Sequence, residues 1–575
     1  MREQENKTNF NFEKVRPAKE IYQDNFHWFY FNEHQTGLPL IALEDLKTGL
    51  TVSTILSVGE QRNAALKAWS GARQSRASGT PWEIMAEIVE KNVNTDQKMK
   101  DMVNGYGHAS VGDMASLQVD LTNVPMHLCF NLFNISSINS GQEKSTRYQS
   151  KFGGATLHPL KNYVGELLDN QDKTVAEIEY AKLGEASLVN FAKYKAIATE
   201  AFTNYFKPEA SQKNSLDSRV LDTVRSFLLF GQLGGMSFET TARDYSRIIG
   251  ELKASPIPYY QSAGTLIENI LAPSEDIEQK FGFKAEAPGL IRHTNPSLIA
   301  NQNLSALKDF LQRKNFGRGF YPNSTFRGQQ EQDMKFVGRE YSEMDKVVTQ
   351  YILTLYPGYD WQTVLKQVSN MNSMTKPQIS EILFNNHSNY NELPPIDRTT
   401  SMTLVMEAAL GEIRDLNRQR ALGRFLPFPA VYGLPMTADT AYQVLGNGYV
   451  LPLYVTEVPE LANIGREMAK DMNKYYSDVY NFVGMMERKF GDGIDYSFVI
   501  NLLPMAHKFS FWMHADPKQA VYMPDRRVKP GGHINYRDLA YLSNQLIADS
   551  DPFFSALRFD KRPDPTNRQE FFDRS

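Results

Sequence analysis

Residues 140–148 gather four side chains that could bind an anionic nucleotide. The segment reads Ser-Gly-Gln-Glu-Lys-Ser-Thr-Arg-Tyr and contains a carboxylate, a hydroxyl, a guanidinium and a phenol at Glu143, Ser145, Arg147 and Tyr148. A guanidinium can hold a phosphate through two parallel hydrogen bonds, whereas a carboxylate and a hydroxyl suit sugar hydroxyls. The spacing alone is also typical of a solvated loop with a local Arg–Glu pair, because short motifs often match by chance.

The same segment resembles the second half of the signature of the flavin-dependent thymidylate synthases. That signature reads Arg-His-Arg-x-x-Ser-x-Asn-Glu-x-Ser-x-Arg-Tyr, and this chain matches it in register at Ser140, Glu143, Ser145, Arg147 and Tyr148. The places of the Arg-His-Arg half hold Ile-Ser-Ser at residues 135–137, which supply no cation for a flavin. The missing half has therefore either decayed or moved elsewhere in the chain.

Other stretches of the first half resemble the same family. His108 and Ser110 form a Gly-His-Ala-Ser match, and the resemblance implies that His108 stacks near folate and flavin and that Ser110 binds the flavin. Arg225 matches an arginine that reaches the nucleotide phosphate. It lies in the apolar run Val-Arg-Ser-Phe-Leu-Leu-Phe, so it needs an anionic partner, because a buried guanidinium left unpaired is very costly.

The family's Asn-Ala-Arg helix reads Thr-Ala-Arg at residues 241–243. Arg243 and Arg247 share one face of this predicted helix, and the resemblance assigns both to the cofactor. The family's final arginine, which polarises the uracil ring, falls at Leu252 in this half.

The second half contains what the first half lacks. A predicted apolar helix over residues 403–413 leads into Arg418, Gln419 and Arg420, which resemble Arg-His-Arg with glutamine in place of histidine. The final arginine is present as Arg527, and residues 532–539 resemble the family's last helix.

The retained motifs of the two halves are complementary. In this family the active sites are shared between subunits of a tetramer. The resemblance therefore implies a tandem fusion in which the nucleotide site is composed from both repeats, and a homodimer equivalent to the family tetramer. The expected fold class is α+β, with two tandem domains of helices around a central antiparallel sheet, forming a pseudo-dimer.

The implied reaction is the reductive methylation of dUMP, with methylenetetrahydrofolate as carbon donor and FAD relaying hydride from NADPH. Arg527 would be catalytic, because it would stabilise charge that develops on the uracil. The resemblance assigns the phosphate to Arg147 and Arg225. It assigns dUMP or FAD contacts to the remaining positions, namely Glu143, Ser145, Arg418, Gln419 and Arg420.

Two alternatives remain open. One is a flavin or nucleotide enzyme of the same fold that acts on another pyrimidine. The other is a non-catalytic relative, which is favoured by Gln419 in place of histidine, Asp516 in place of asparagine and Lys518 in place of arginine.

The elements that would position these residues follow from composition and periodicity. We expect a polar and aromatic lead segment at 1–50, a first repeat at 51–285, a linker with one short helix at 286–330 and a second repeat at 331–575. Apolar spacing predicts a core-packed helix around residues 82–89, a buried element at 126–133, a long surface helix at 175–205 and a buried segment at 221–233.

Charge and cysteine content narrow the function classes further. The 575 residues include 62 basic and 66 acidic side chains, so the net charge of −4 gives no footprint for nucleic acid or a membrane surface. No run of about 18 apolar residues is present, and we expect a cytoplasmic protein. The single cysteine, Cys129, excludes an intramolecular disulfide and a multi-cysteine zinc site, and its apolar setting predicts a buried, inert thiol.

Overall fold

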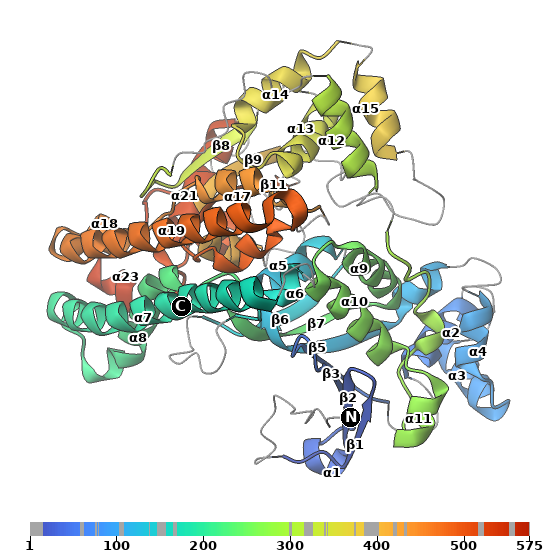
Figure 1. Cartoon of the computed structure of the whole chain (residues 1–575). Helices are drawn as coiled ribbons and strands as arrows, with labels where there is room; N and C mark the ends of the chain where they lie inside the picture. The colour runs from blue at the N-terminus through green and yellow to red at the C-terminus, as the bar shows by residue number, and fades with distance from the viewer. Residues whose placement is uncertain are drawn as a thin grey trace. The chain divides into compact units, whose positions relative to one another are not determined.

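The computed structural model (Figure 1) is an α+β protein of helices and antiparallel sheets. It describes residues 15–57, 63–74, 78, 80–102, 109–136, 138–146, 157–164, 170–297, 302–314, 326–337, 341, 343–372, 375–384, 402–417, 422–429, 434–515, 523–550 and 558–573.

The chain folds into two compact units, and each unit is assembled from three separate stretches of the sequence. Unit 1 comprises Met1–Val124, Ile135–Lys144 and Leu233–Leu298. Unit 2 comprises Pro125–Asn134, Ser145–Gln232 and Ile299–Ser575. Unit 2 therefore takes parts of both sequence halves, and the segment that resembles the signature changes unit after Lys144.

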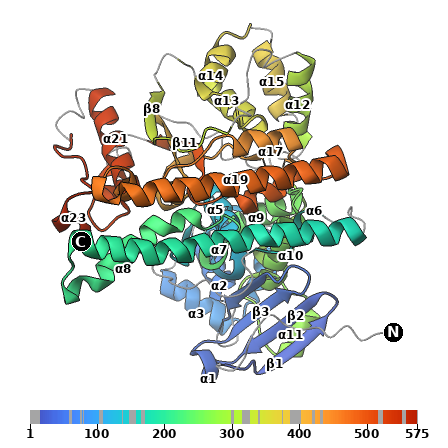
Figure 2. The ribbon, with the colours of Figure 1, turned by 60° about the vertical axis from the view of Figure 1, so that its left-hand side comes forward.

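Unit 1 is built on a seven-stranded sheet with the strand order β1-β2-β3-β4-β5-β7-β6. Its strands are β1 (Lys19–Gln23), β2 (Phe26–Phe31), β3 (Leu40–Asp45), β4 (Thr51–Ile55), β5 (Ser116–Pro125), β6 (Ser140–Glu143) and β7 (Leu233–Thr241). Figure 2 shows β1, β2 and β3 as adjoining strands. The expected lead segment thus supplies three strands of this sheet. In β5 the buried side chains alternate at Leu117, Val119 and Leu121, as a strand with one face on a core requires.

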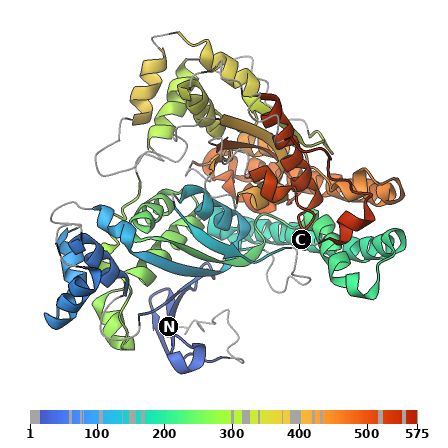
Figure 3. The ribbon, with the colours of Figure 1, turned by 180° about the vertical axis from the view of Figure 1, so that it is seen from behind.

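The helices of unit 1 lie beside this sheet and beyond one end of it, as the view from behind shows (Figure 3). They are α1 (Glu33–Thr36), α2 (Asn63–Gln74), α3 (Pro81–Glu90), α4 (Thr95–Lys100), α9 (Ala242–Ala254), α10 (Pro258–Leu271) and α11 (Glu275–Phe281). Helix α10 packs on β3 and β4, and α9 packs on β7, where the Tyr245 hydroxyl donates to the Phe238 carbonyl at 2.9 Å.

Unit 2 contains a four-stranded antiparallel sheet with the order β10-β11-β9-β8. Its strands are β8 (Asp333–Val337), β9 (Met402–Ala409), β10 (Gly423–Phe425) and β11 (Lys508–Ala515). Its helices are α5 (Met126–Ile135, except the last residue), α6 (Lys161–Val164), α7 (Asn170–Phe206), α8 (Lys213–Val224), α12 (Leu304–Arg313), α13 (Glu343–Leu355), α14 (Trp361–Ser369), α15 (Thr375–Phe384), α16 (Leu410–Leu416), α17 (Ala438–Leu445), α18 (Leu453–Thr456), α19 (Ala462–Phe490), α21 (Ile534–Ser550) and α23 (Arg568–Phe572).

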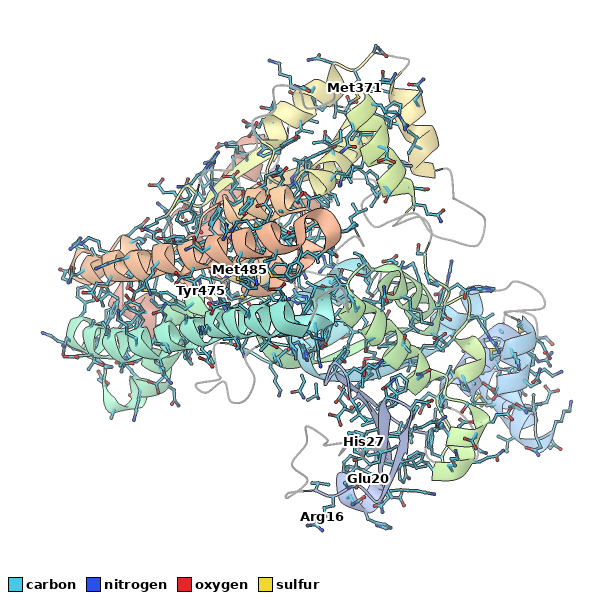
Figure 4. The ribbon with its side chains drawn as sticks, viewed as in Figure 1. Arg16, Glu20, His27, Met371, Tyr475 and Met485 are labelled. Carbon is cyan, nitrogen blue, oxygen red and sulfur yellow. The ribbon has the colours of Figure 1, made fainter. Side chains whose placement is uncertain are left out.

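Two long helices from different sequence halves, α7 and α19, run side by side in unit 2 (Figures 1 and 2). Tyr180 of α7 lies 6.2 Å from Phe482 of α19, measured between ring centroids, and Lys193 pairs with Asp471 at 2.7 Å. Tyr475, labelled in Figure 4, is buried and its hydroxyl donates to the Leu502 carbonyl at 2.9 Å. The contact is therefore apolar along its centre and closed by an ion pair.

The two sheets repeat one arrangement of strands and helices. The order β4-β5-β7-β6 in unit 1 matches β8-β9-β11-β10 in unit 2. Helices α2 to α4 separate β4 from β5, and α13 to α15 separate β8 from β9. Strand β5 leads directly into α5, as β9 leads into α16. The next strand along the chain, β6 or β10, is followed later by a long helix, α7 or α19.

Equivalent loops of the two halves also exchange hydrogen bonds within unit 2. The Phe230 amide donates to the Leu503 carbonyl at 2.7 Å, and the Met505 amide donates to the Leu228 carbonyl at 2.6 Å. An offset of 275 residues takes position 228 to 503 and position 230 to 505, so it exchanges the two ends of the contact: 230 bonds to 503, and 505 bonds to 228. The contact is reciprocal, which is the pattern made by two copies of one surface around a two-fold axis.

Most elements expected from periodicity are present in the structure. The buried element is α5, the long helix is α7 with one buried face, the buried segment is the end of α8 and the turn after it, and the short helix of the expected linker is α12. Cys129 is buried and reduced.

Two expectations about packing were wrong. The expected helix over 403–413 is strand β9 followed by α16, because both faces of β9 are buried and a strand buried on both faces needs no alternation of apolar and polar residues. In α3 only Ile84 and Ile88 are buried, while Trp82 is 72% and Val89 is 64% exposed. The apolar face of α3 is thus wider than the surface it packs on.

Candidate functional site

Several residues of the expected nucleotide site lie outside the described part of the chain. These are His108, Arg147, Tyr148, Arg418, Gln419 and Arg420. Ser110 lies in the short 3-10 helix Ala109–Met114, and the structure describes its backbone. Their roles stay predictions.

Glu143 and Ser145 border the point where the chain changes unit. Glu143 is the last residue of β6, where it pairs with Met236 of β7, and it is buried. Ser145 follows two residues later, is half-buried and belongs to unit 2. Because the two residues belong to different units, the surroundings of each are described separately. Their shared role in a sugar or ring contact stays a prediction.

Arg243 and Arg247 have different surroundings although both lie in α9. Arg243 is exposed and pairs with Asp113 at 3.0 Å. The Arg247 guanidinium is engaged by Asp244 at 2.7 Å, by Glu251 at 2.6 Å and by the Ile135 carbonyl. Arg243 is thus an exposed, ion-paired cation, whereas the donors of Arg247 are engaged by acceptors in a less exposed setting.

The structure brings Arg225 of the first sequence half against α16 of the second half, within unit 2. Its side chain is buried, and one terminal nitrogen lies 2.9 Å from an Asp415 carboxylate oxygen and 3.6 Å from Glu412. The anionic partner required by the sequence is thus a pair of carboxylates. A phosphate bound to Arg225 would have to displace them.

The carboxyl of Glu412 has a raised pKa because it is buried. Burial raises the pKa of its carboxyl from 4.5 to about 7, against the lowering effect of Arg225 and with a further rise from Asp415. Burial outweighs the cation because Arg225 makes its close contact with Asp415, not with Glu412. The Glu412 Oε2 atom is buried with no hydrogen-bond partner among the described residues.

His533 completes this buried ionic cluster, which we define as Asp222, Arg225, Glu412, Asp415 and His533. Nε2 of His533 lies 3.0 Å from the Asp222 carbonyl oxygen, which only accepts, so Nε2 carries the hydrogen. Nδ1 accepts the Asn535 amide at 3.1 Å and lies 3.3 Å from Glu412 Oε1. The Asn535 amide thus occupies the acceptor site of Nδ1, and Glu412 lies beside it without a hydrogen bond to the ring.

A narrow crevice reaches the cluster. Its lining includes Arg225, Gly411, Glu412 and Asn535, and it contains about 190 Å³ of empty space, which includes space open to solvent. No part of it is wide enough for a water molecule. A ligand could reach Glu412 here only if the walls moved.

The equivalent position of the other half is uncharged. His127 Nε2 and Asn501 Oδ1 are 2.7 Å apart, and burial lowers the pKa of His127 to about 3, so its imidazole is neutral. The amides of Met126 and His127 bond to Gln232 and Phe230, as those of Leu410 and Gly411 bond to His507 and Met505. Gly411 is thus the counterpart of His127, and the ionic cluster is present on one side only.

Arg527 lies in unit 2 near the start of the loop that precedes α21. It is half-buried, and its guanidinium lies 5.8 Å from the ring centroid of Tyr536. This placement leaves the side chain partly accessible, as contact with a substrate ring requires. Leu252, its sequence counterpart in α9, is fully buried.

Sequence reasoning missed Glu412, Asp415 and His533. A signal was present, because α16 is buried along its length and yet carries Glu412, Arg414 and Asp415. Charged side chains in a buried helix require partners, which is the argument that identified Arg225.

Among the described residues, no group of three or more His, Cys, Asp or Glu side chains could hold a metal ion. None of the described helices is long and apolar enough to cross a membrane.

No protein-family model matches the chain. It is similar to a UPF0159 protein of Chlamydia pneumoniae, with 21% identity over 466 residues that cover 79% of this chain and 77% of the relative. A match at this level of identity assigns no family.

Proposed function

We propose that the chain is an FAD-dependent thymidylate synthase, a pseudo-dimer of two divergent repeats whose nucleotide site takes residues from both. The reaction would convert dUMP, methylenetetrahydrofolate, NADPH and one proton to dTMP, tetrahydrofolate and NADP⁺. The observation that carries the proposal is the proximity of Arg225, from the first repeat, to Asp415 of α16 in the second repeat, at 2.9 Å. The arginine expected to bind the phosphate thus lies beside the helix that precedes Arg418 in the sequence, and a phosphate bound there would take the place of the two carboxylates.

Two further features support a duplication. The strand order of the unit 2 sheet repeats that of four strands in unit 1. The reciprocal bonds of Leu228 and Phe230 with Leu503 and Met505 agree with a fused pair of equivalent surfaces.

The residues described fit a flavin in part. Arg243 has the exposure and charge to meet a diphosphate, while Arg247 has its donors engaged by Asp244, Glu251 and Ile135. When bound, the flavin would supply the hydride. The chain would supply placement and charge: Arg527 would face the uracil ring and stabilise the negative charge that develops there.

The test removes one predicted contact from each repeat. Arg147→Ala and Arg418→Ala should each lower dUMP-dependent flavin reoxidation by at least about tenfold, because each loses a charge-assisted contact. The control is Arg466→Ala, an exposed arginine of α19 whose contact within the helix is with Asn463. Full activity in either site variant would contradict the shared site.

The wild-type protein provides the first check. Purified protein should show a flavin absorption band and should release the C5 proton of labelled dUMP. Turnover of dCMP without dUMP would favour the other-pyrimidine alternative, and a colourless protein that binds no FAD would favour the non-catalytic one.

A further inference from the structure

Helix α23 lies against the end of α7 in unit 2, where it is anchored by an aromatic contact. Phe571 is buried and stacks on Phe206 with ring centroids 3.8 Å apart. Arg568 Nε donates to the Phe206 carbonyl at 2.9 Å. We name residues 567–573, which are Asn567, α23 and Asp573, the α23 clasp.

One fully buried guanidinium ties this clasp to the loop that follows Arg527. Arg219 donates to the Phe571 carbonyl at 2.9 Å and to the Asp573 carbonyl at 3.2 Å. The same guanidinium donates at 2.7 Å to the carbonyls of Pro530 and Gly532. Its donors are thus divided between the α23 clasp and the loop that follows Arg527.

A second arginine repeats this bridge. Arg537 Nε donates to the Val528 carbonyl at 3.0 Å, and its Nη2 donates to a Glu570 carboxylate oxygen at 2.6 Å. Residues 528–532 are therefore held at three carbonyls by two arginines, each of which also holds the α23 clasp.

This loop connects Arg527 to the ionic cluster. Arg527 precedes the loop, and His533, which contacts Glu412, follows it. Gly532 lies against the Tyr536 ring, where an added Cβ would meet the ring carbons at 2.6 Å, and Arg527 lies over the same ring. The position of Arg527 is thus set by the loop, and the loop by Arg219 and Arg537.

We propose that the α23 clasp is a positioning element for Arg527, with Arg219, Arg537 and Glu570 as positioning residues. The effect on catalysis rests on the proposed function, whereas the hold on the loop does not. Weakening the clasp should leave Arg527 present but misplaced, which costs reaction rate more than substrate affinity.

The test variant is Glu570→Gln, which keeps the side-chain shape and removes one charge. The matched control is Asp471→Asn, because the two carboxylates have similar side-chain exposure, 28% and 25%, and each accepts one ion pair. Asp471 joins α19 to α7 and has no contact with the loop.

The first measurement is independent of activity. Trypsin cuts after Arg526 and Arg527, while Lys529 is protected by the proline that follows it. Glu570→Gln should speed cleavage at these two bonds by about fivefold, because local opening becomes easier, and Asp471→Asn should not. Equal cleavage in all three proteins would overturn the inference.

The second measurement is flavin reoxidation by dUMP and methylenetetrahydrofolate, together with dUMP affinity by calorimetry. Glu570→Gln should lower the rate by about tenfold and change the dissociation constant by less than about twofold. Faster cleavage with an unchanged rate would overturn the positioning role. A wild-type protein without dUMP chemistry would instead overturn the proposed function, while the cleavage result would still decide whether the clasp holds the loop.

Discussion

Glu412 is the residue whose protonation decides the charge of the buried ionic cluster. With Glu412 ionised, Arg225 faces two negative carboxylates in a setting that excludes water. With Glu412 protonated, the Asp415 carboxylate alone faces the Arg225 guanidinium. Burial is the main reason for the raised pKa of Glu412, and the neighbouring Asp415 carboxylate adds to it.

Glu412→Gln should remove the pH dependence that this group imposes on stability, because glutamine does not titrate. The folded-state pKa of about 7 exceeds the ordinary 4.5, so the contribution of Glu412 is fully present below about pH 4.5 and is lost as the pH rises toward 7. Relative to wild type, the variant should gain up to about 3 kcal/mol in unfolding free energy between about pH 5 and pH 8. Urea denaturation across this range measures the difference.

Asp471→Asn is the control for this experiment. Burial alone would raise the pKa of Asp471. Hydrogen bonds from Lys193 and Tyr194 lower it by more, so the net shift of the pKa is downward. Asp471 is therefore ionised throughout the range, and its difference from wild type should stay constant. A constant difference for Glu412→Gln as well would show that the pKa of Glu412 is ordinary.

Arg527 should matter for rate rather than for binding. Arg527→Ala should slow flavin reoxidation by about a hundredfold or more with little change in dUMP affinity, because its donor acts on charge that develops during the reaction. Arg527→Lys should also be slow, since it keeps the charge but loses the planar fork. Stopped-flow absorbance measures both, and Arg526→Ala, its exposed neighbour, should react normally.

At the scale of elements, the close approach of α18 to α19 depends on one glycine. A Cβ at Gly465 would meet the Val455 carbonyl oxygen, a backbone atom that cannot rotate away. At Gly484, on the same helix, the nearest atoms are the ends of the Arg488 and Tyr442 side chains at 3.3 Å. Both glycines lie in α19, so the two positions differ in the atoms that an added methyl group would meet.

Gly465→Ala should lower the unfolding free energy by about 1–3 kcal/mol, because α18 must move to admit the methyl group. Gly484→Ala should be neutral or stabilising by up to about 1 kcal/mol, since alanine favours the helix and the side chains can move aside. Thermal denaturation of both variants measures the contrast. Equal destabilisation of both would mean that helix packing at Val455 is looser than the structure shows.

Periodicity predicted the elements that have one buried face and failed where both faces are covered. Helix α7 presents a polar face, so its length and type were readable from the sequence. Strand β9 is covered on both faces and reads as a continuous apolar run, which a helix segment can also produce. Apolar spacing can also overestimate burial. In α3, Trp82 follows the apolar spacing of a helix and is nevertheless exposed to solvent.

The candidate site was predictable only for residues that match a motif or violate burial rules. Arg225 was found because a cation in an apolar run needs a partner. Which carboxylates supply that partner depends on contacts between residues about 190 positions apart, and these contacts arise from packing that no local pattern encodes. The same applies to Arg219, whose four carbonyl acceptors are all distant in sequence.

At the scale of the whole molecule, the proposed site predicts how two inactive variants behave together. If each chain builds its nucleotide site from its own two repeats, mixing Arg147→Ala with Arg418→Ala should restore no activity after subunit exchange. Sites built between chains would instead regain up to about a quarter of wild-type activity, because a mixed dimer carries one intact combination. The dUMP-dependent rate of the mixture distinguishes the two arrangements.

The offset that relates Leu228 to Leu503 also relates Arg225 to Ile500, and the offset that relates Met126 to Leu410 relates Glu412 to Leu128. In an assembly of identical chains, a charged residue beside a two-fold axis lies opposite the same residue of the other chain. Every substitution there therefore changes both sides of the axis. A chain that carries both partners in one gene is released from this rule. One side of its axis can become ionic while the other stays apolar, so selection can act on each side separately.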